Sequence, residues 1–153
     1  MKIKRIVKHV IDCDSYPSNP GGCSCRIIEH RKGGQLEFNP ADISLHVSKN
    51  QTNNFPGIAG NLLWRELDRD GLHVLNANVL DYLLAHPELI PMEWKDKVVL
   101  FWGTTFRDNG HAYVAGIRWH NGGVWCDPGW CRWTATLSHH IHKFYSAAVL
   151  TKK

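Results

Sequence analysis

The sequence has no long hydrophobic run. Its longest continuous apolar stretch is Val98–Trp102, which has the length of a strand, whereas a membrane helix needs about 20 apolar residues. The basic start of the chain reaches Asp12 and Asp14 before any adequate apolar stretch, so the pattern of a secretory signal is missing. These absences argue against export and membrane spans, and they predict a cytoplasmic protein.

The sequence also lacks the local signatures of common enzymes. The glycine, lysine and hydroxyl spacing of a phosphate-binding loop is absent, and no serine lies in a nucleophile-elbow pattern. The cysteines fit no known motif of thiol enzymes. No reaction can therefore be named from a motif.

Composition is that of an ordinary folded protein. The chain has 153 residues, of which 43% are hydrophobic and 21% charged. These values are far from those of disordered chains, and the length suits one domain with its own core. We therefore expect a single globular domain over residues 1–153, without internal repeats or low-complexity tracts.

Hydrophobic patterning predicts an α+β fold. Short alternating segments indicate N-terminal strands, and Leu80, Leu83 and Leu84 share one face of a helix that Asn76 or Asn78 can cap. Residues 98–136 indicate an antiparallel meander, with Asp108-Asn109-Gly110 as a hairpin turn. We expect this sheet to pack two or more short helices on one face, with the three leucines buried against it.

Several phrases of the sequence resemble a group of small uncharacterised bacterial proteins. They are His30-Arg-Lys-Gly-Gly-Gln35, Leu75-Asn-Ala-Asn-Val-Leu-Asp-Tyr-Leu-Leu84, Ile90-Pro91, Glu93-Trp94-Lys95 and Phe101-Trp-Gly-Thr104. The match spans most of residues 30–119. The resemblance implies one self-contained domain and transfers no activity, cofactor or site residue.

Five cysteines raise the question of a metal. Cys23 and Cys25 form one close pair, Cys126 and Cys131 form another, and two pairs folded together can provide the four ligands of tetrahedral zinc. The single residue inside the first pair is tighter than usual spacing, and buried cysteine is a common small hydrophobe. We expect no structural zinc and no other cofactor. If a metal is bound, these four thiols are the expected ligands.

A basic, glycine-rich segment, His30-Arg31-Lys32 followed by two glycines, could hold an anion with side-chain charge and backbone N–H groups. The alternative is a solvated turn between two strands, which its composition favours.

The C-terminal part combines positive charge with tryptophan. Residues 97–153 carry a net charge of +5, against −1 for residues 1–96. Arg107, Arg118 and Arg132 lie among five tryptophans, of which Trp119 and Trp125 are the expected apolar anchors. Arginine with tryptophan is typical of binding surfaces, although large aromatics also build cores.

The sequence thus favours a non-enzymatic binding module whose partner is a protein or a nucleic acid. A small cysteine- or zinc-dependent enzyme is the alternative. Strand pleating adds a constraint, because Arg118 and Trp119 point to opposite faces of one strand. Both can contact one partner only where that strand lies at an edge.

Overall fold

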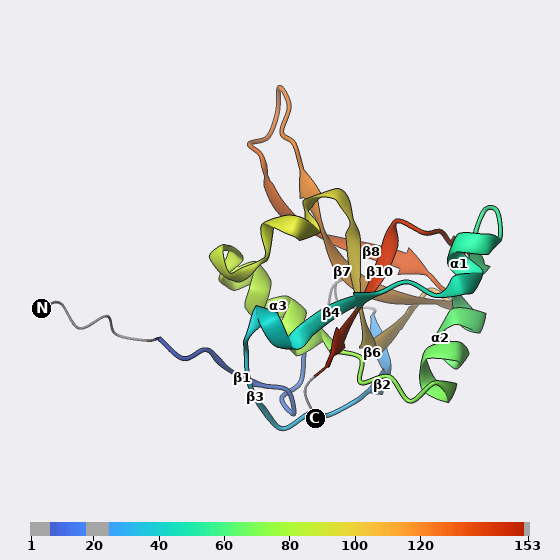
Figure 1. The fold of residues 1–153 in the computed structure, drawn as a ribbon, viewed down its shortest axis with the longest axis horizontal. Coiled ribbons are helices and arrows are strands. Elements are labelled where there is room, and N and C mark those ends of the chain that lie inside the picture. The colour runs from blue at the N-terminus through green and yellow to red at the C-terminus, as the bar shows by residue number, and fades with distance from the viewer. Residues whose placement is uncertain (1–6, 18–24, 152–153) are drawn as a thin grey trace, which may run out of the picture.

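The computed structural model describes residues 7–17 and 25–151. Its main sheet contains β2 (Arg26–His30), β4 (Ile43–His46), β6 (Val98–Asp108), β7 (His111–His120), β8 (Gly129–Thr136) and β10 (Tyr145–Leu150). Two small sheets pair β1 (Val10–Asp12) with β3 (Gln35–Glu37), and β5 (Ile58–Ala59) with β9 (His140–Ile141). The helices are α1 (Lys49–Asn53), α2 (Gly60–Arg69) and α3 (Ala77–Ala85), with 3₁₀ turns η1 (Pro40–Asp42), η2 (Pro87–Leu89) and η3 (Met92–Asp96). The expected α+β class is confirmed (Figure 1).

The predicted meander is present as β6, β7 and β8, which pair antiparallel in chain order. Asn109 and Gly110 both have positive φ at the first reversal, as a tight hairpin turn requires. The last strand, β10, was not predicted. It inserts between β4 and β6 and runs parallel to β6, so the main sheet is mixed. Its small residues Ser146, Ala147 and Ala148 carry little hydrophobic pattern, which is why the sequence did not indicate it.

Strand β6 changes partner along one edge. Residues 98–100 pair with β10, whereas residues 104–107 pair with β2. Gly103 lies at this junction, where its N–H donates to the carbonyl of Leu75 and its own carbonyl accepts from the Arg31 N–H. A Cβ on Gly103 would lie 2.8 Å from the Asn76 Cα. The segment before α3 therefore fills the gap between β2 and β10 only because residue 103 is glycine.

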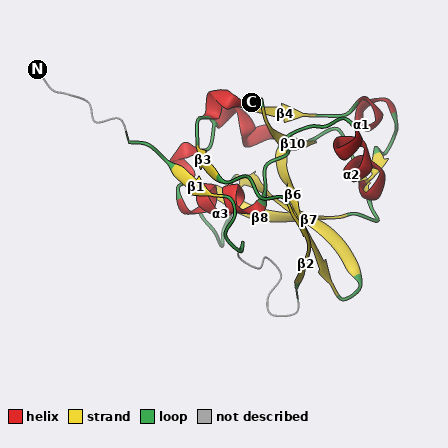
Figure 2. Cartoon of the chain, turned by 90° about the horizontal axis from the view of Figure 1, so that it is seen from below, coloured by secondary structure: helices red, strands yellow, loops and turns green. Residues whose placement is uncertain are grey.

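The two main helices cover opposite faces of the sheet (Figure 2). Leu80 and Leu83 of α3 pack in one core, and Leu63 and Leu67 of α2 pack in the other. The expectation that both helices share one face is wrong. A central strand with apolar residues on both faces needs cover on each, and β6 alternates between the two cores along residues 99–102.

The predicted burial of the α3 stripe is confirmed for Leu80 and Leu83, which are fully buried. Leu84 is only partly buried against the same core. Of the two candidate caps, Asn76 and Asn78, Asn76 is the helix cap, because its side chain accepts from the Asn78 N–H. The polar segment of residues 48–60 contains α1. A capping box between Ser48 and Gln51 stabilises this short helix.

None of the helices in the described part of the chain is long and apolar enough to cross a membrane.

Candidate binding surface

The most distinctive surface lies where β7 projects past the start of β6. Arg118 pairs with Val98 at the start of β6, whereas Trp119 and His120 pair only with β8. On its β6 side the strand is therefore an edge from Trp119 onward. Arg118 and Trp119 point to opposite faces, yet both line one hollow of about 310 Å³. Strand pleating allows both residues to contact one partner only where the strand lies at an edge, and this part of β7 is such an edge.

Cations and aromatic rings line this hollow, which we call the cationic groove. Its lining includes the cations Lys95, Lys97 and Arg118 and the rings of Trp119, Trp133 and Phe144. The Lys95 Nζ lies 3.8 Å from the centroid of the Trp119 ring, and the Arg118 Cζ lies 4.6 Å from that of Trp133. The Trp119 ring in turn meets Trp130 edge to face at 5.3 Å. Such cation–π pairs hold both the charge and the ring in fixed positions at the surface.

The charge of the groove is only partly neutralised. Lys97 donates to Asp96 at 2.9 Å, and this contact holds the pKa of the Asp96 carboxyl below its ordinary value. Among the ion pairs of the described residues, none involves Lys95 or Arg118. Their charges therefore face rings and solvent, where an anionic group of a ligand can reach them.

A second hollow, of about 480 Å³, adjoins the groove and shares His142 and Phe144 with it. We call it the apolar socket. It lies between the segment after α1 and the turn before β10, and its walls include Phe55, Pro56 and Phe144. Lys143 and His142 also line it. The His142 ring stacks on Tyr145 at 4.3 Å, so the turn that carries these residues is packed against the sheet.

The structure separates the three arginines singled out from the sequence. Arg107 is exposed at the β6–β7 hairpin, and its guanidinium has one long contact, 3.5 Å, with the Gly110 carbonyl. Arg132 lies on the α3 face and donates to Asp81 of α3 at 2.6 Å. Only Arg118 lines the cationic groove. Lys95 and Trp133 complete it. The tertiary contact of η3 with β7 brings Lys95 there, and the pairing of β8 with β7 brings Trp133.

Trp125 does not line the groove and lies midway along the β7–β8 connection. This connection stands out from the molecule (Figure 1), and together with the flanking strand residues His120 and Gly129 it is called the finger, residues 120–129. Trp125 is 95% exposed. Trp102, in contrast, is buried in the core next to α2, so the tryptophans of this region serve both as core and as surface.

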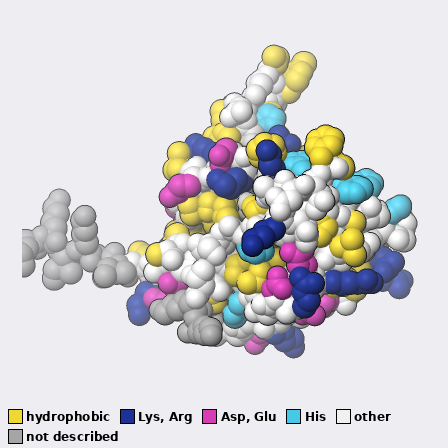
Figure 3. Space-filling model, turned by 45° about the vertical axis from the view of Figure 1, so that its right-hand side comes forward, with side chains coloured by type: hydrophobic (Ala, Val, Ile, Leu, Met, Phe, Trp, Pro, Cys, Tyr) yellow, Lys and Arg dark blue, Asp and Glu magenta, His cyan; other side chains and the backbone are white. Residues whose placement is uncertain are grey.

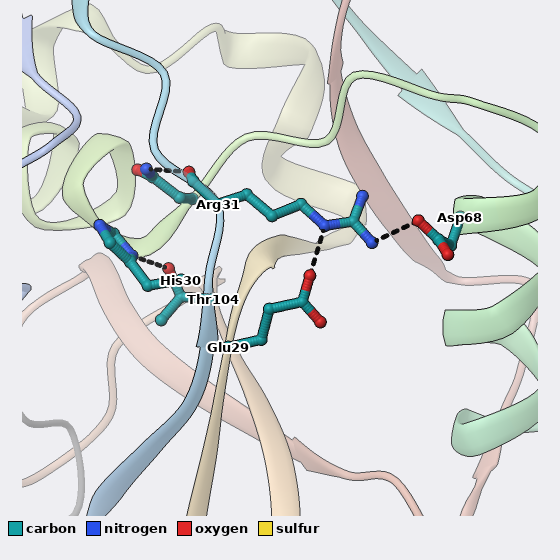
Figure 4. A network of polar contacts seen from close by, with 6 residues as sticks. Glu29, His30, Arg31, Asp68 and Thr104 are labelled. Carbon is teal, nitrogen blue, oxygen red and sulfur yellow. Dashed lines mark hydrogen bonds and ion pairs between the residues drawn. The ribbon is translucent and has the colours of Figure 1, made fainter.

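The basic segment His30-Arg31-Lys32 is largely engaged within the protein (Figure 4). His30 Nε2 donates to the Cys13 carbonyl at 3.2 Å, and Nδ1 forms a hydrogen bond of 2.9 Å with the Thr104 hydroxyl. Arg31 forms ion pairs with Glu29 and Asp68, at 2.9 and 3.0 Å. Lys32 is exposed. The side chains of His30 and Arg31 therefore connect β2 to its neighbours.

The polar contacts around Asn76 form a buried junction. The Asn76 amide donates to the carbonyls of Cys13 and Arg31, and the Thr104 hydroxyl accepts from the Ala77 N–H. We call Asn76, Thr104, His30 and Cys13 the polar hub. It joins the N-terminal segment, β2, β6 and the start of α3.

The four cysteines within the described residues differ in burial and in contacts. Cys13 is buried, and burial, with smaller contributions from Asp14 and Asp12, raises the pKa of its thiol to about 11. Cys25 contacts the Tyr113 hydroxyl at 2.8 Å, and burial together with this contact raises the pKa of Tyr113. Cys131 is partly buried and Cys126 is exposed.

No three His, Cys, Asp or Glu side chains within residues 7–17 and 25–151 are grouped so that they could hold a metal ion. Cys23, one of the four expected ligands, lies outside the described residues. The prediction that the protein carries no structural zinc stays a prediction.

One thiol has a histidine beside it. The Cys126 Sγ lies 3.5 Å from Nδ1 and 3.9 Å from Nε2 of His120, within the finger. The same Nδ1 accepts the Gly122 N–H, so it is already used to shape the loop. Sequence spacing alone did not single out this pair among ten histidines.

Comparisons with known proteins place the chain in no family: no protein-family model, no curated protein and no solved structure matches it.

Proposed function

We propose that the protein is a non-enzymatic binding module that holds single-stranded nucleic acid in the cationic groove. One observation carries the proposal: two cation–π pairs, Lys95 with Trp119 and Arg118 with Trp133, surround a single hollow. Proteins that bind single strands combine backbone-tracking cations with rings on which bases stack. Both elements are present here within a few ångströms of each other.

The chemistry favours a single strand over a duplex. A hollow of about 310 Å³ has room for a base and its sugar, whereas the bases of a duplex hide their faces in the stack. The outer plane of the Arg118 guanidinium can take a base, as arginine planes do in recognition of unpaired RNA. Its N–H groups can donate to a phosphate at the same time.

Comparison with Arg132 supports a role for Arg118 beyond stability. Arg132 is held by an acidic partner, Asp81, and serves to tie α3 to β8. Arg118 is held only by the ring of Trp133 among the described contacts. A cation kept at the surface without a carboxylate remains available for an anion.

Binding of labelled twelve-residue oligothymidylate and oligouridylate, followed by fluorescence anisotropy, tests the proposal. We expect affinity to fall steeply with salt, and Arg118→Ala to weaken binding about 10-fold and flatten the salt dependence by about one unit. Lys95→Ala should act in the same direction. Arg69→Ala is the matched control, because its exposed guanidinium pairs with Asp70 away from the groove. No binding, or equal losses for Arg118→Ala and Arg69→Ala, would refute the proposal and leave a protein partner as the expected ligand.

A second candidate, a thiol-dependent enzyme, rests on the contact between Cys126 and His120. A histidine near a thiol can increase the thiolate fraction and so its reactivity. In that case iodoacetamide should modify Cys126 rapidly at neutral pH, and His120→Ala should slow the reaction at least 10-fold. An unchanged rate would remove this candidate. Stoichiometric zinc in elemental analysis would favour an enzyme with a metal site.

A further inference from the structure

Trp125, at the end of the finger, is the largest of the exposed hydrophobic side chains among the described residues. Val124 is 91% exposed and Trp125 is 95% exposed, side by side. In the space-filling view, hydrophobic side chains lie at the end of the finger, away from the body of the protein (Figure 3). Exposed tryptophan on a projecting loop is typical of the anchor residues that dominate protein interfaces.

The loop is built to present this tryptophan. The Gly123 N–H donates to the Cys126 carbonyl, which closes a tight turn with Val124 and Trp125 at its apex. The Gly122 N–H donates to His120. Gly122 has a φ of +84° and packs against Pro128, where a Cβ would lie 2.9 Å from the proline ring. These contacts define the shape in which the turn presents Trp125.

Charge indicates what the finger fits. Residues 119–131 contain no lysine or arginine, and their only acidic side chain is Asp127. Phosphates and anionic lipids would therefore gain nothing from the finger itself. A suitable receptor has an apolar interior for the indole and positive charge at its rim for Asp127.

The apolar socket has these properties. Its volume of about 480 Å³ is in the range of pockets that enclose small ligands, so an indole ring can enter it. Phe55 and Phe144, which are 101% and 56% exposed, provide aromatic walls. Lys143 lines the socket, and its Nζ lies 5.6 Å from the centroid of the Phe144 ring. The finger and the socket match in size, polarity and charge.

We propose that this protein associates with a second copy of itself, with Trp125 of one molecule inserted into the apolar socket of the other. Val124 then covers the edge of the socket, and Asp127 approaches Lys143. The proposal does not depend on nucleic-acid binding, because neither Trp125 nor Phe55 lines the cationic groove.

Sedimentation velocity without nucleic acid tests this association. We expect the wild type to move from monomer to larger species below about 500 μM, a concentration that detects weak interfaces. Trp125→Ala removes the anchor, Phe55→Ala removes a socket wall, and each should weaken association at least 10-fold. Leu62→Ala, an exposed apolar residue of α2 that is 53% exposed, is the control and should behave as the wild type.

Mixing the two variants makes the test decisive. Trp125→Ala keeps an intact socket and Phe55→Ala keeps an intact finger, so the mixture regains one complete contact and should form mixed complexes that neither variant forms alone. A wild type that stays monomeric, a Trp125→Ala variant that associates normally, or a mixture without complexes would each overturn the proposal. Loss of association with intact oligonucleotide binding separates this interface from the proposed function.

Discussion

The polar hub and the projecting end of β7 use the same residue types in opposite ways. In and beside the hub, Cys13 is buried and Arg31 is held by two carboxylates. At the end of β7, Cys126 is exposed and Arg118 is held by a ring. The hub pairs its polar groups internally, whereas the groove and finger leave charge and apolar surface open. The neighbouring group that each side chain contacts, more than its residue type, distinguishes structural side chains from those available for binding.

Truncation of a buried side chain should reduce stability the most. Leu83→Ala should lower the free energy of unfolding by about 2–5 kcal/mol, because it leaves a cavity between α3 and the sheet. Leu83 has no exposed surface. Urea denaturation measures the loss, and Leu62→Ala on the exposed side of α2 should change stability by less than about 0.5 kcal/mol.

Asn76→Ala should come next, with a loss of about 2–4 kcal/mol in the same measurement. The substitution removes the cap of α3. It also removes the amide that donates to the buried Cys13 carbonyl and to the partly buried Arg31 carbonyl. Asn61→Ala, at an exposed position of α2, is the control. Equal stability of the two variants would show that the hub does not hold the fold together.

The raised pKa of the Cys13 thiol should make the protein less stable at alkaline pH. Its thiol has a pKa of about 11 in the folded protein against an ordinary value of 9.0, so the unfolded chain ionises first. Its contribution is complete below pH 9 and declines by about 2–3 kcal/mol as the pH rises to 11. Tyr113, whose pKa is also raised, adds a decline above its ordinary value of 10.0. In the Cys13→Ala variant, the decline in stability that begins near pH 9 should be absent when thermal unfolding is measured as a function of pH.

Substitution of Arg132 in β8 should reduce stability more than substitution of Arg118 in β7. Arg132→Ala breaks a partly buried ion pair with Asp81 and should cost about 1–3 kcal/mol of stability. Arg118→Ala loses a surface cation–π pair, worth about 0.5–1 kcal/mol, and should affect oligonucleotide affinity more than folding. Chemical denaturation of both variants, with binding measured in parallel, checks this. The reverse order would remove the distinction between structural and available cations.

The smallest expected effect is that of Trp125→Ala on folding. Because the side chain is 95% exposed, the melting temperature of the monomer at low concentration should stay within about 2 °C of the wild type. A large drop would mean that Trp125 supports the finger and is not held ready for a partner.

Much of the fold could be predicted from local pattern. The Asp108-Asn109-Gly110 turn, the Asn76 cap and the apolar stripe of α3 depend on neighbours in the sequence, and all are present. Strand β10 could not be predicted, since Ala147 and Ala148 gain their burial from β4 and β6, which are distant in the chain. For the same reason the placement of α2 and α3 on opposite faces was missed.

The candidate surface, too, could be predicted only in part from local pattern. The sequence by itself determined that arginine and tryptophan concentrate in the C-terminal part and that Arg118 and Trp119 face opposite sides of one strand, because composition and pleating are local properties. Only the tertiary structure decided which of these residues meet. It extended β7 beyond β6, brought Lys95 onto Trp119, and paired Arg132 with Asp81 fifty-one residues away. Contacts between distant segments depend on how the whole chain packs, and no local pattern records them.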